Sequence, residues 1–229
     1  MGRHQKYFCC LLMLGCLSPA SESTAMIDKN NILPRLASLP HVELELGCGR
    51  RKRNSESIGV DILDYPDVDI VGDVYETLKS FPAGSVDAIY SYHFVEHLPE
   101  ISKLLSELAR IVRPNGDVEI VAPHFSNPYF YSDPTHRSFF GLYTLCYFAS
   151  DSPFSRHVPT YDAKLEFSIV EVDLIFKSPH PFVIRYGIKR IVGSIINSCN
   201  YLKELYEENF CYLFPCYEVR YILRRHVFR

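Results

Sequence analysis

The chain has 229 residues, of which 47% are hydrophobic and 22% charged, and its formal net charge at neutral pH is −3. This length suits one α/β domain with a sizeable core and gives no strong reason to expect two. The negative charge argues against a general nucleic-acid-binding protein, whose binding domain is usually basic. The eight cysteines form no Cys-x-x-Cys pair, so we predict reduced thiols in a cytosolic protein.

The first 25 residues allow two interpretations. A basic start, an apolar run too short to span a bilayer and a small, polar stretch are typical of a secretory signal peptide, and Cys16 lies in a sequence that resembles a lipoprotein cleavage site. Alternatively, residues 1–25 are an over-extended start and Met26 is the initiator. In both cases we expect residues 26–229 to form a single domain.

Strand and helix signals alternate along this domain. Strands are predicted at residues 42–46, 58–61, 68–72, 85–91, 117–122, 165–176 and 218–227. Residues 99–112 place their apolar side chains on one helical face, and the turn at 113–116 ends that helix. A helical region that includes residues 182–202 lies between the last two strands. This alternation favours an α/β fold with a doubly wound, mostly parallel sheet of seven strands.

A glycine turn follows the first predicted strand, and a carboxylate ends the second. The turn is Glu45-Leu46-Gly47-Cys48-Gly49, and the carboxylate is Asp61. Glycine lets the backbone take a positive φ and approach a ligand closely. A carboxylate at the end of the next strand suits a ribose diol. The pair therefore predicts one side of a nucleoside pocket.

This order resembles the class I S-adenosylmethionine-dependent methyltransferases, specifically the small single-domain bacterial type, from about residue 40 to the end of the chain. The resemblance rests on residues 45–49, 59–61, 73–74, 93–98, 108–116, 132–140 and 206–215. It implies a Rossmann-like sheet whose last two strands form an antiparallel edge, with a cosubstrate half at 40–123 and an acceptor or cap half at 124–229. The family often has another glycine where this chain has residues 50–54, and we expect Asn54 to tolerate a left-handed conformation there.

The carboxylates suit S-adenosylmethionine as the cosubstrate, because that molecule carries a ribose diol, an adenine amine, an ammonium and a sulfonium but no phosphate. We expect Asp61 to accept from the ribose, Asp73 and the Val74 N–H to bind adenine, and Glu45 to neutralise the ammonium. The predicted cosubstrate contacts are Glu45, Gly47, Cys48, Gly49, Asp61, Ile62, Asp73, Val74 and Ser91. For Asp73 and Glu45 the alternative is a purely structural role, in a solvated turn and at a capped strand end.

His93-x-x-Glu96-His97 has the spacing of an inverted zinc-protease motif. On a helix it would place two histidines on one face for zinc, with the glutamate as a base. Here the motif follows a strand in a nucleoside-binding order and has no obvious third ligand. We therefore predict no metal, and expect a loop and a helix start with His93 near the transferred methyl group.

Two further patterns have alternative interpretations. The basic run at residues 50–53 could hold the phosphate of NADP, but Asp61 would repel a 2′-phosphate, so we predict a solvated loop face. The apolar stripe at residues 182–202, with basic residues interspersed, could lie on a membrane surface. We favour the interpretation that this stripe packs in the core or forms a cap over the pocket.

The segment after the fifth predicted strand, residues 123–137, is dense in aromatic side chains and histidines. Ligands bind outside the carboxyl ends of the strands in such sheets, so we expect this segment to line the acceptor pocket. His136, His124 and His93 are the candidate general bases, and Asp133 could orient one of them. The alternative is that these histidines only hydrogen-bond within loops.

The sequence thus predicts a cytoplasmic methyltransferase that acts on a small-molecule or glycan-type acceptor, on oxygen or nitrogen, without a nucleic-acid partner. A non-catalytic binding or scaffold protein that retains the fold is the main alternative. An exported or lipidated protein that uses the fold for interaction is a third. The acceptor and the oligomeric state are not specified by the sequence.

Overall fold

The computed structural model describes residues 26–161, 167–178 and 181–226. The two interpretations of residues 1–25 therefore concern residues outside the described chain. None of the described helices combines the length and hydropathy that a bilayer span requires. The cysteines in the described ranges are free thiols: Cys48, Cys146, Cys199, Cys211 and Cys216.

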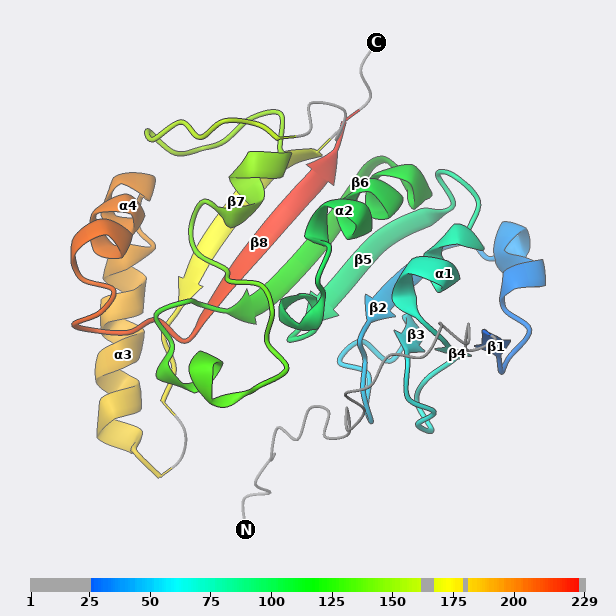
Figure 1. Cartoon of the computed structure of the whole chain (residues 1–229), viewed down its shortest axis with the longest axis horizontal. Coiled ribbons are helices and arrows are strands. Elements are labelled where there is room, and N and C mark those ends of the chain that lie inside the picture. The colour runs from blue at the N-terminus through cyan, green and yellow to red at the C-terminus, as the bar shows by residue number, and fades with distance from the viewer. Residues whose placement is uncertain (1–25, 162–166, 179–180, 227–229) are drawn as a thin grey trace.

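One mixed sheet runs through the described chain, with its strands in the order β1-β4-β3-β2-β5-β6-β8-β7 (Figure 1). The strands are β1 (Ile27–Asp28), β2 (Glu43–Leu46), β3 (Ile58–Asp61), β4 (Ile70–Val71), β5 (Val86–Tyr92), β6 (Val112–Pro123), β7 (Phe167–Ile175) and β8 (Glu218–Arg225). The five strands from β4 to β6 are parallel, and β8 is antiparallel to both β6 and β7. This confirms the doubly wound, mostly parallel sheet with its antiparallel edge.

The predicted seven strands become eight because β1 pairs antiparallel with β4 at the other edge. A two-residue strand is too short to carry the period-2 pattern by which strands are recognised in a sequence. Its pairing depends on β4, which lies far along the chain. Only the assembled sheet therefore reveals it.

The helices of the described chain are α1 (Val74–Lys79), α2 (Ile101–Ile111), α3 (Val183–Ile196) and α4 (Asn200–Asn209), with 3-10 turns η1 (Leu33–Ser38), η2 (Val95–His97), η3 (Pro128–Ser132) and η4 (Thr144–Phe148). In Figure 1, α1 and α2 lie on one face of the sheet, whereas α3 and α4 stand beyond β7. Helix α2 confirms the predicted helix, and its apolar face is buried in the core. The sequence did not predict α1.

The predicted turn after α2 lies within the bounds of β6. Val112 pairs with Val86, the register then shifts, and regular pairing resumes at Asp117. Between these positions Asn115 takes φ 63°, which asparagine tolerates better than most residues. The chain therefore turns at the predicted residues, but it does so inside the strand.

The apolar stripe predicted at 182–202 divides into α3 and α4, and for α3 the prediction of a core helix is wrong. Gly193, which packs against Phe176, is the only buried residue of α3. Ile184 and Ile191 are 82% and 65% exposed. The periodicity correctly gave a helix with an apolar stripe, but it does not specify which side the protein covers. The membrane-surface interpretation of this helix stays a prediction.

Candidate active site

The glycine turn after β2 has the geometry that the sequence predicts. Gly47 and Gly49 have φ of 65° and 62°, and the Gly47 N–H donates to the Val60 carbonyl at 2.8 Å. A Cβ atom on Gly47 would lie 2.4 Å from the ring of Phe94. Both the backbone conformation and the close approach of Phe94 therefore require glycine at position 47.

Asp61, at the end of β3, braces this turn. One carboxylate oxygen accepts the N–H of Gly49 at 2.8 Å and the other accepts the N–H of Leu63 at 2.9 Å. A carboxylate has about four lone-pair sites, so both oxygens can accept further bonds. The neighbouring Ile62 is 49% exposed and offers an apolar surface beside the carboxylate.

Glu45 is 2% exposed, and its carboxylate accepts the N–H groups of Arg53 and Asn54 at 2.9 and 3.0 Å. These bonds fit the structural alternative, in which the carboxylate closes the loop after the glycine turn. Asn54 is not among the described residues with positive φ, so its predicted left-handed conformation is wrong. The side-chain amide of Asn54 instead donates a hydrogen bond to the Glu43 carboxylate.

The remaining predicted cosubstrate residues lie at the ends of β2, β4 and β5. Asp73 caps α1 by accepting the N–H groups of Tyr75 and Glu76 through one oxygen, Oδ1, and Val74 is buried. Burial raises the pKa of the Cys48 thiol to about 12, so this cysteine is a packing group and not a nucleophile. Ser91 is buried, and its hydroxyl has no hydrogen-bond partner among the described residues.

The basic run at residues 50–53 is largely the solvated loop face that we predicted, because Arg50, Arg51 and Arg53 are exposed. Lys52 forms an ion pair with Asp69 at 2.8 Å, and its side chain is only 15% exposed. The guanidinium of Arg53 lies over the Tyr92 ring at 4.2 Å from the ring centre. Lys52 alone is partly buried, because a long basic side chain can bury its stem while pairing its charge.

His93 follows β5 in a left-handed conformation with φ 55°. Its ring lies between two carboxylates, with Nε2 2.9 Å from Glu218 and Nδ1 3.5 Å from Glu96. Burial lowers the pKa of His93, but the two carboxylates outweigh burial and raise the pKa to about 9. His93 is therefore an imidazolium at neutral pH, which does not suit the predicted role of a general base.

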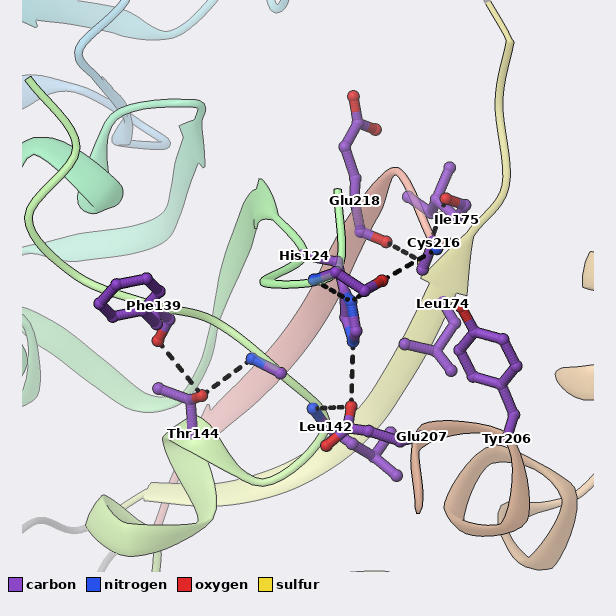
Figure 2. Close-up of polar contacts among 12 residues, drawn as sticks. His124, Phe139, Leu142, Thr144, Leu174, Ile175, Tyr206, Glu207, Cys216 and Glu218 are labelled. Atoms are coloured by element: carbon purple, nitrogen blue, oxygen red, sulfur yellow. Dashed lines mark hydrogen bonds and ion pairs between the residues drawn. The ribbon is translucent and has the colours of Figure 1, made fainter. Parts of the chain in front are cut away.

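His124, the first residue after β6, is fully buried. Its Nδ1 lies 2.8 Å from the Ser126 hydroxyl and its Nε2 lies 3.0 Å from a carboxylate oxygen of Glu207. Figure 2 shows the His124 ring directed at Glu207, whose carboxylate also accepts the Leu142 N–H at 2.6 Å. Both ring nitrogens are engaged inside the protein, so this environment fits the alternative of a hydrogen-bonding histidine and not a base that meets an acceptor.

The fold brings two separate sequence motifs together around His136. Single ligand atoms of Glu96, His97 and His136 all lie within 4.8 Å of one another. A carboxylate oxygen of Asp133 lies 3.8 Å from His136 Nε2. Sequence reasoning had singled out each motif but did not connect them.

Hydrogen bonds fix the tautomers of the two histidines in this cluster. His136 Nδ1 lies 2.8 Å from the Phe130 carbonyl; because a carbonyl only accepts, Nδ1 carries the proton and Nε2 carries the lone pair. The Thr135 hydroxyl donates its single proton to Asp133 at 2.6 Å, so it accepts from His97 Nδ1 at 2.8 Å. His97 Nε2 therefore also carries a lone pair.

Glu96 is 1% exposed, and its Oε2 has no hydrogen-bond partner within the described ranges. Its backbone carbonyl accepts the N–H groups of Arg137 and Ser138 at 2.7 and 3.1 Å. These bonds hold the segment after η3 against η2. A buried carboxylate and two imidazole rings thus share one small region.

Residues 44–120 match the protein-family model that is described as a methyltransferase domain. The chain therefore contains a stretch that matches a methyltransferase domain. No curated protein sequence is significantly similar to it. The assignment agrees with the glycine turn after β2 and the carboxylate at the end of β3.

Two solved methyltransferase structures have a fold similar to that of this chain. An S-adenosylmethionine-dependent methyltransferase from Archaeoglobus fulgidus is 21% identical, with a TM-score of 0.55 over 85% of this chain and 93% of that chain. Phosphoethanolamine N-methyltransferase 2 from Haemonchus contortus, solved with S-adenosylmethionine, is 16% identical, with a TM-score of 0.50. That comparison covers 85% of this chain and 51% of the Haemonchus protein, so this chain spans about half the length of that enzyme.

The histidine cluster lies beside the glycine turn. Strands β2 and β5 are parallel neighbours, with Leu46 opposite Ser91. The glycine turn and the chain that leads into η2 therefore leave the sheet side by side. The contact between Gly47 and Phe94 joins them directly.

Proposed function

We propose that the methyltransferase transfers the methyl group of S-adenosylmethionine to an oxygen or nitrogen atom of a small-molecule or glycan-type acceptor beside His136. The observation that carries this proposal is the contact between Phe94 and Gly47, because it joins the glycine turn to the segment that holds Glu96 and His97. A cosubstrate on the glycine turn would then present its methyl group toward the cluster. The net charge of −3 favours an acceptor other than nucleic acid.

In the proposed cosubstrate site, Asp61 accepts both ribose hydroxyls through the lone pairs that Gly49 and Leu63 leave free. Asp73 caps α1 through Oδ1 alone, so its Oδ2 is left for the adenine amine, beside the Val74 N–H. Glu45 contributes negative charge for the ammonium. Gly47, Cys48, Gly49, Ile62 and Ser91 complete the proposed contacts.

The proposed reaction is an in-line displacement that depends mainly on alignment. A lone pair of the acceptor attacks the methyl carbon, the carbon–sulfur bond breaks, and its electrons leave with sulfur to give neutral S-adenosylhomocysteine. In the metal-free protein, His136 Nε2 takes the acceptor proton. Of the three histidine candidates His136 suits this role best, because His93 is already charged and His124 is buried. Asp133, which holds Thr135, is a positioning residue.

Calorimetry tests the cosubstrate half of the proposal. Purified protein should bind S-adenosylhomocysteine with a dissociation constant of micromolar order, or about −8 kcal/mol, and should not bind NADP comparably. Tight NADP binding without S-adenosylhomocysteine binding would contradict the proposal. Metabolite profiling with labelled S-adenosylmethionine, comparing wild type with Asp61→Ala, then identifies the acceptor.

His136→Ala tests the acceptor half once that acceptor is known. Loss of a general base lowers the rate by about 10²–10⁴-fold, whereas S-adenosylhomocysteine affinity should remain near that of wild type. His124→Ala gives the comparison for a buried hydrogen-bonder, and His157→Ala, at an exposed position, is the matched control. A rate near that of wild type in His136→Ala would remove the proposed base. Cosubstrate binding without turnover on any acceptor would favour the scaffold alternative.

We also propose that the reaction takes place in the cytoplasm, because S-adenosylmethionine is a cytosolic metabolite. Sequencing the amino terminus of the mature protein tests this. A protein that begins at Met26 supports the proposal. Cleavage of a signal peptide near Cys16, or lipidation of that residue, would favour export.

A further inference from the structure

We propose that Glu96, His97 and His136 form a binding site for a divalent transition metal, with zinc as the probe of choice. Their ligand atoms lie within 4.8 Å of one another. The sequence motif suggested His93 and His97 as the histidine pair and lacked a third ligand. The fold instead directs His93 to Glu218 and supplies His136 from the distant segment after η3.

Both histidines are set as metal ligands by their second hydrogen bonds. A metal-bound imidazole usually donates its other ring N–H to a carbonyl, a carboxylate or water, which fixes the tautomer. His136 does so to the Phe130 carbonyl. His97 does so to the Thr135 hydroxyl, which in turn donates to Asp133. In each neutral ring the lone pair is therefore left on Nε2.

Glu96 provides an independent observation that points to a cation. Its side chain is 1% exposed, and Oε2 has no hydrogen-bond partner in the described part of the chain. Burying a carboxylate oxygen without a partner is costly. The His93 imidazolium lies 3.5 Å from the other oxygen, Oε1, but it is shared with Glu218. A metal ion bound by this carboxylate would compensate its buried charge.

The donor set selects the class of metal. Two imidazole nitrogens and one carboxylate favour zinc, iron(II) or a similar ion over magnesium and calcium, which prefer oxygen ligands. Ligand atoms around one such ion lie about 3–4 Å apart, given bonds of roughly 2.0–2.2 Å. His136 Nε2 and Glu96 Oε1 are 4.0 Å apart, so small side-chain rotations suffice. Three protein ligands leave at least one coordination position open.

The chemistry of the metal rests on the proposed function, whereas its binding does not. An ion at this site would polarise an acceptor oxygen as a Lewis acid and favour its deprotonation. His136 would then be a ligand and no longer the group that takes the proton. The cluster would thus activate the acceptor both with and without the metal: as a Lewis acid when the ion is bound, and through His136 as a base when it is absent.

Zinc binding to the untagged full-length protein tests the site. After treatment with a chelator and its removal, wild type should bind about one equivalent of Zn²⁺ in a competition titration with a chromogenic chelator. Cobalt(II) should produce visible absorption bands at the same stoichiometry. The double variant His97→Ala and His136→Ala should lose at least 100-fold in affinity, whereas the control His157→Ala should bind like wild type.

Thr135→Val keeps the ligands and removes the hydroxyl that orients His97. It should weaken Zn²⁺ binding by about 10–100-fold, and it provides a second variant if the double variant fails to fold. No Zn²⁺ or Co²⁺ binding by folded wild type, or unchanged affinity in the double variant and in Thr135→Val, would overturn the site. S-adenosylhomocysteine affinity measured on the same samples separates the two proposals. Its loss with intact Zn²⁺ binding would contradict the proposed function alone.

Discussion

Replacing Asp61 with alanine tests the cosubstrate site at the residue where its geometry is best defined. The carboxylate accepts the N–H of Gly49 at 2.8 Å and that of Leu63 at 2.9 Å. It therefore fixes the end of the glycine turn even before a ligand binds. In the proposed complex its remaining lone pairs accept two ribose hydroxyls, so the substitution removes four hydrogen bonds of two kinds.

The two kinds of bond affect two different measurements. A hydrogen bond to a charged group contributes about 1.5–3 kcal/mol, and water replaces part of each ribose bond because Asp61 is only partly buried. We expect affinity for S-adenosylhomocysteine to fall at least tenfold, or about 1.4 kcal/mol. The backbone bonds contribute to the free energy of unfolding, which should fall by on the order of 1–2 kcal/mol.

Calorimetry and urea denaturation on the same variants separate these effects. Asp64→Ala is the matched control, because Asp64 lies in the loop after the same strand, and its side chain is 68% exposed and pairs with Lys29. It should bind S-adenosylhomocysteine like wild type. A folded Asp61→Ala protein with unchanged affinity would mean that the ribose lies elsewhere. Equal losses in both variants would point to the charge of the loop and not to a specific contact.

Gly47→Ala should lower the free energy of unfolding by at least about 1 kcal/mol more than Gly84→Ala in urea denaturation. Both glycines have φ 65°, so the left-handed backbone costs an alanine about 1–2 kcal/mol at either position. Only at Gly47 would the added Cβ atom also clash with Phe94. Equal losses in the two variants would therefore contradict a steric role for Phe94. Burial raises the pKa of Glu204, but the Arg156 N–H and neighbouring donors outweigh burial and lower it overall. The stability that ionised Glu204 contributes is therefore fully present above its unfolded pKa of about 4.3 and is lost as pH falls through the lower folded value. The destabilisation of Glu204→Gln relative to wild type should be constant from about pH 6 to 8 and should shrink in acid, and a deficit independent of pH would refute this account.

The parallel part of the sheet was predictable because buried strands and an amphipathic helix have distinct periods in the sequence. Helix α1 was missed for a specific reason. An aspartate after a strand can contact a ligand, lie in a solvated turn or cap a helix, and the prediction for Asp73 covered only the first two. Its carboxylate accepts the N–H groups of Tyr75 and Glu76, which is the usual geometry of an N-cap. Residue type and position alone do not separate these roles.

The histidines show what sequence motifs omit. His93 and His124 were sound candidates by position, but their environments come from Glu218 and Glu207, which lie far along the chain in β8 and α4. Those partners make His93 cationic and engage both nitrogens of His124. Nothing within the local motif indicates either outcome, because long-range packing determines both burial and charge pairing.

The cluster itself depends on backbone contacts that no side-chain pattern reveals. The Glu96 carbonyl accepts the N–H groups of Arg137 and Ser138, and the Ser138 hydroxyl donates to the Leu98 carbonyl at 2.8 Å. These bonds set His136 beside Glu96 without using any proposed ligand atom. The main chain therefore contributes to bringing the three side chains together, independently of any bond between them. A main chain that holds such a group in place is the property expected of a site organised in advance for a cation or an acceptor proton.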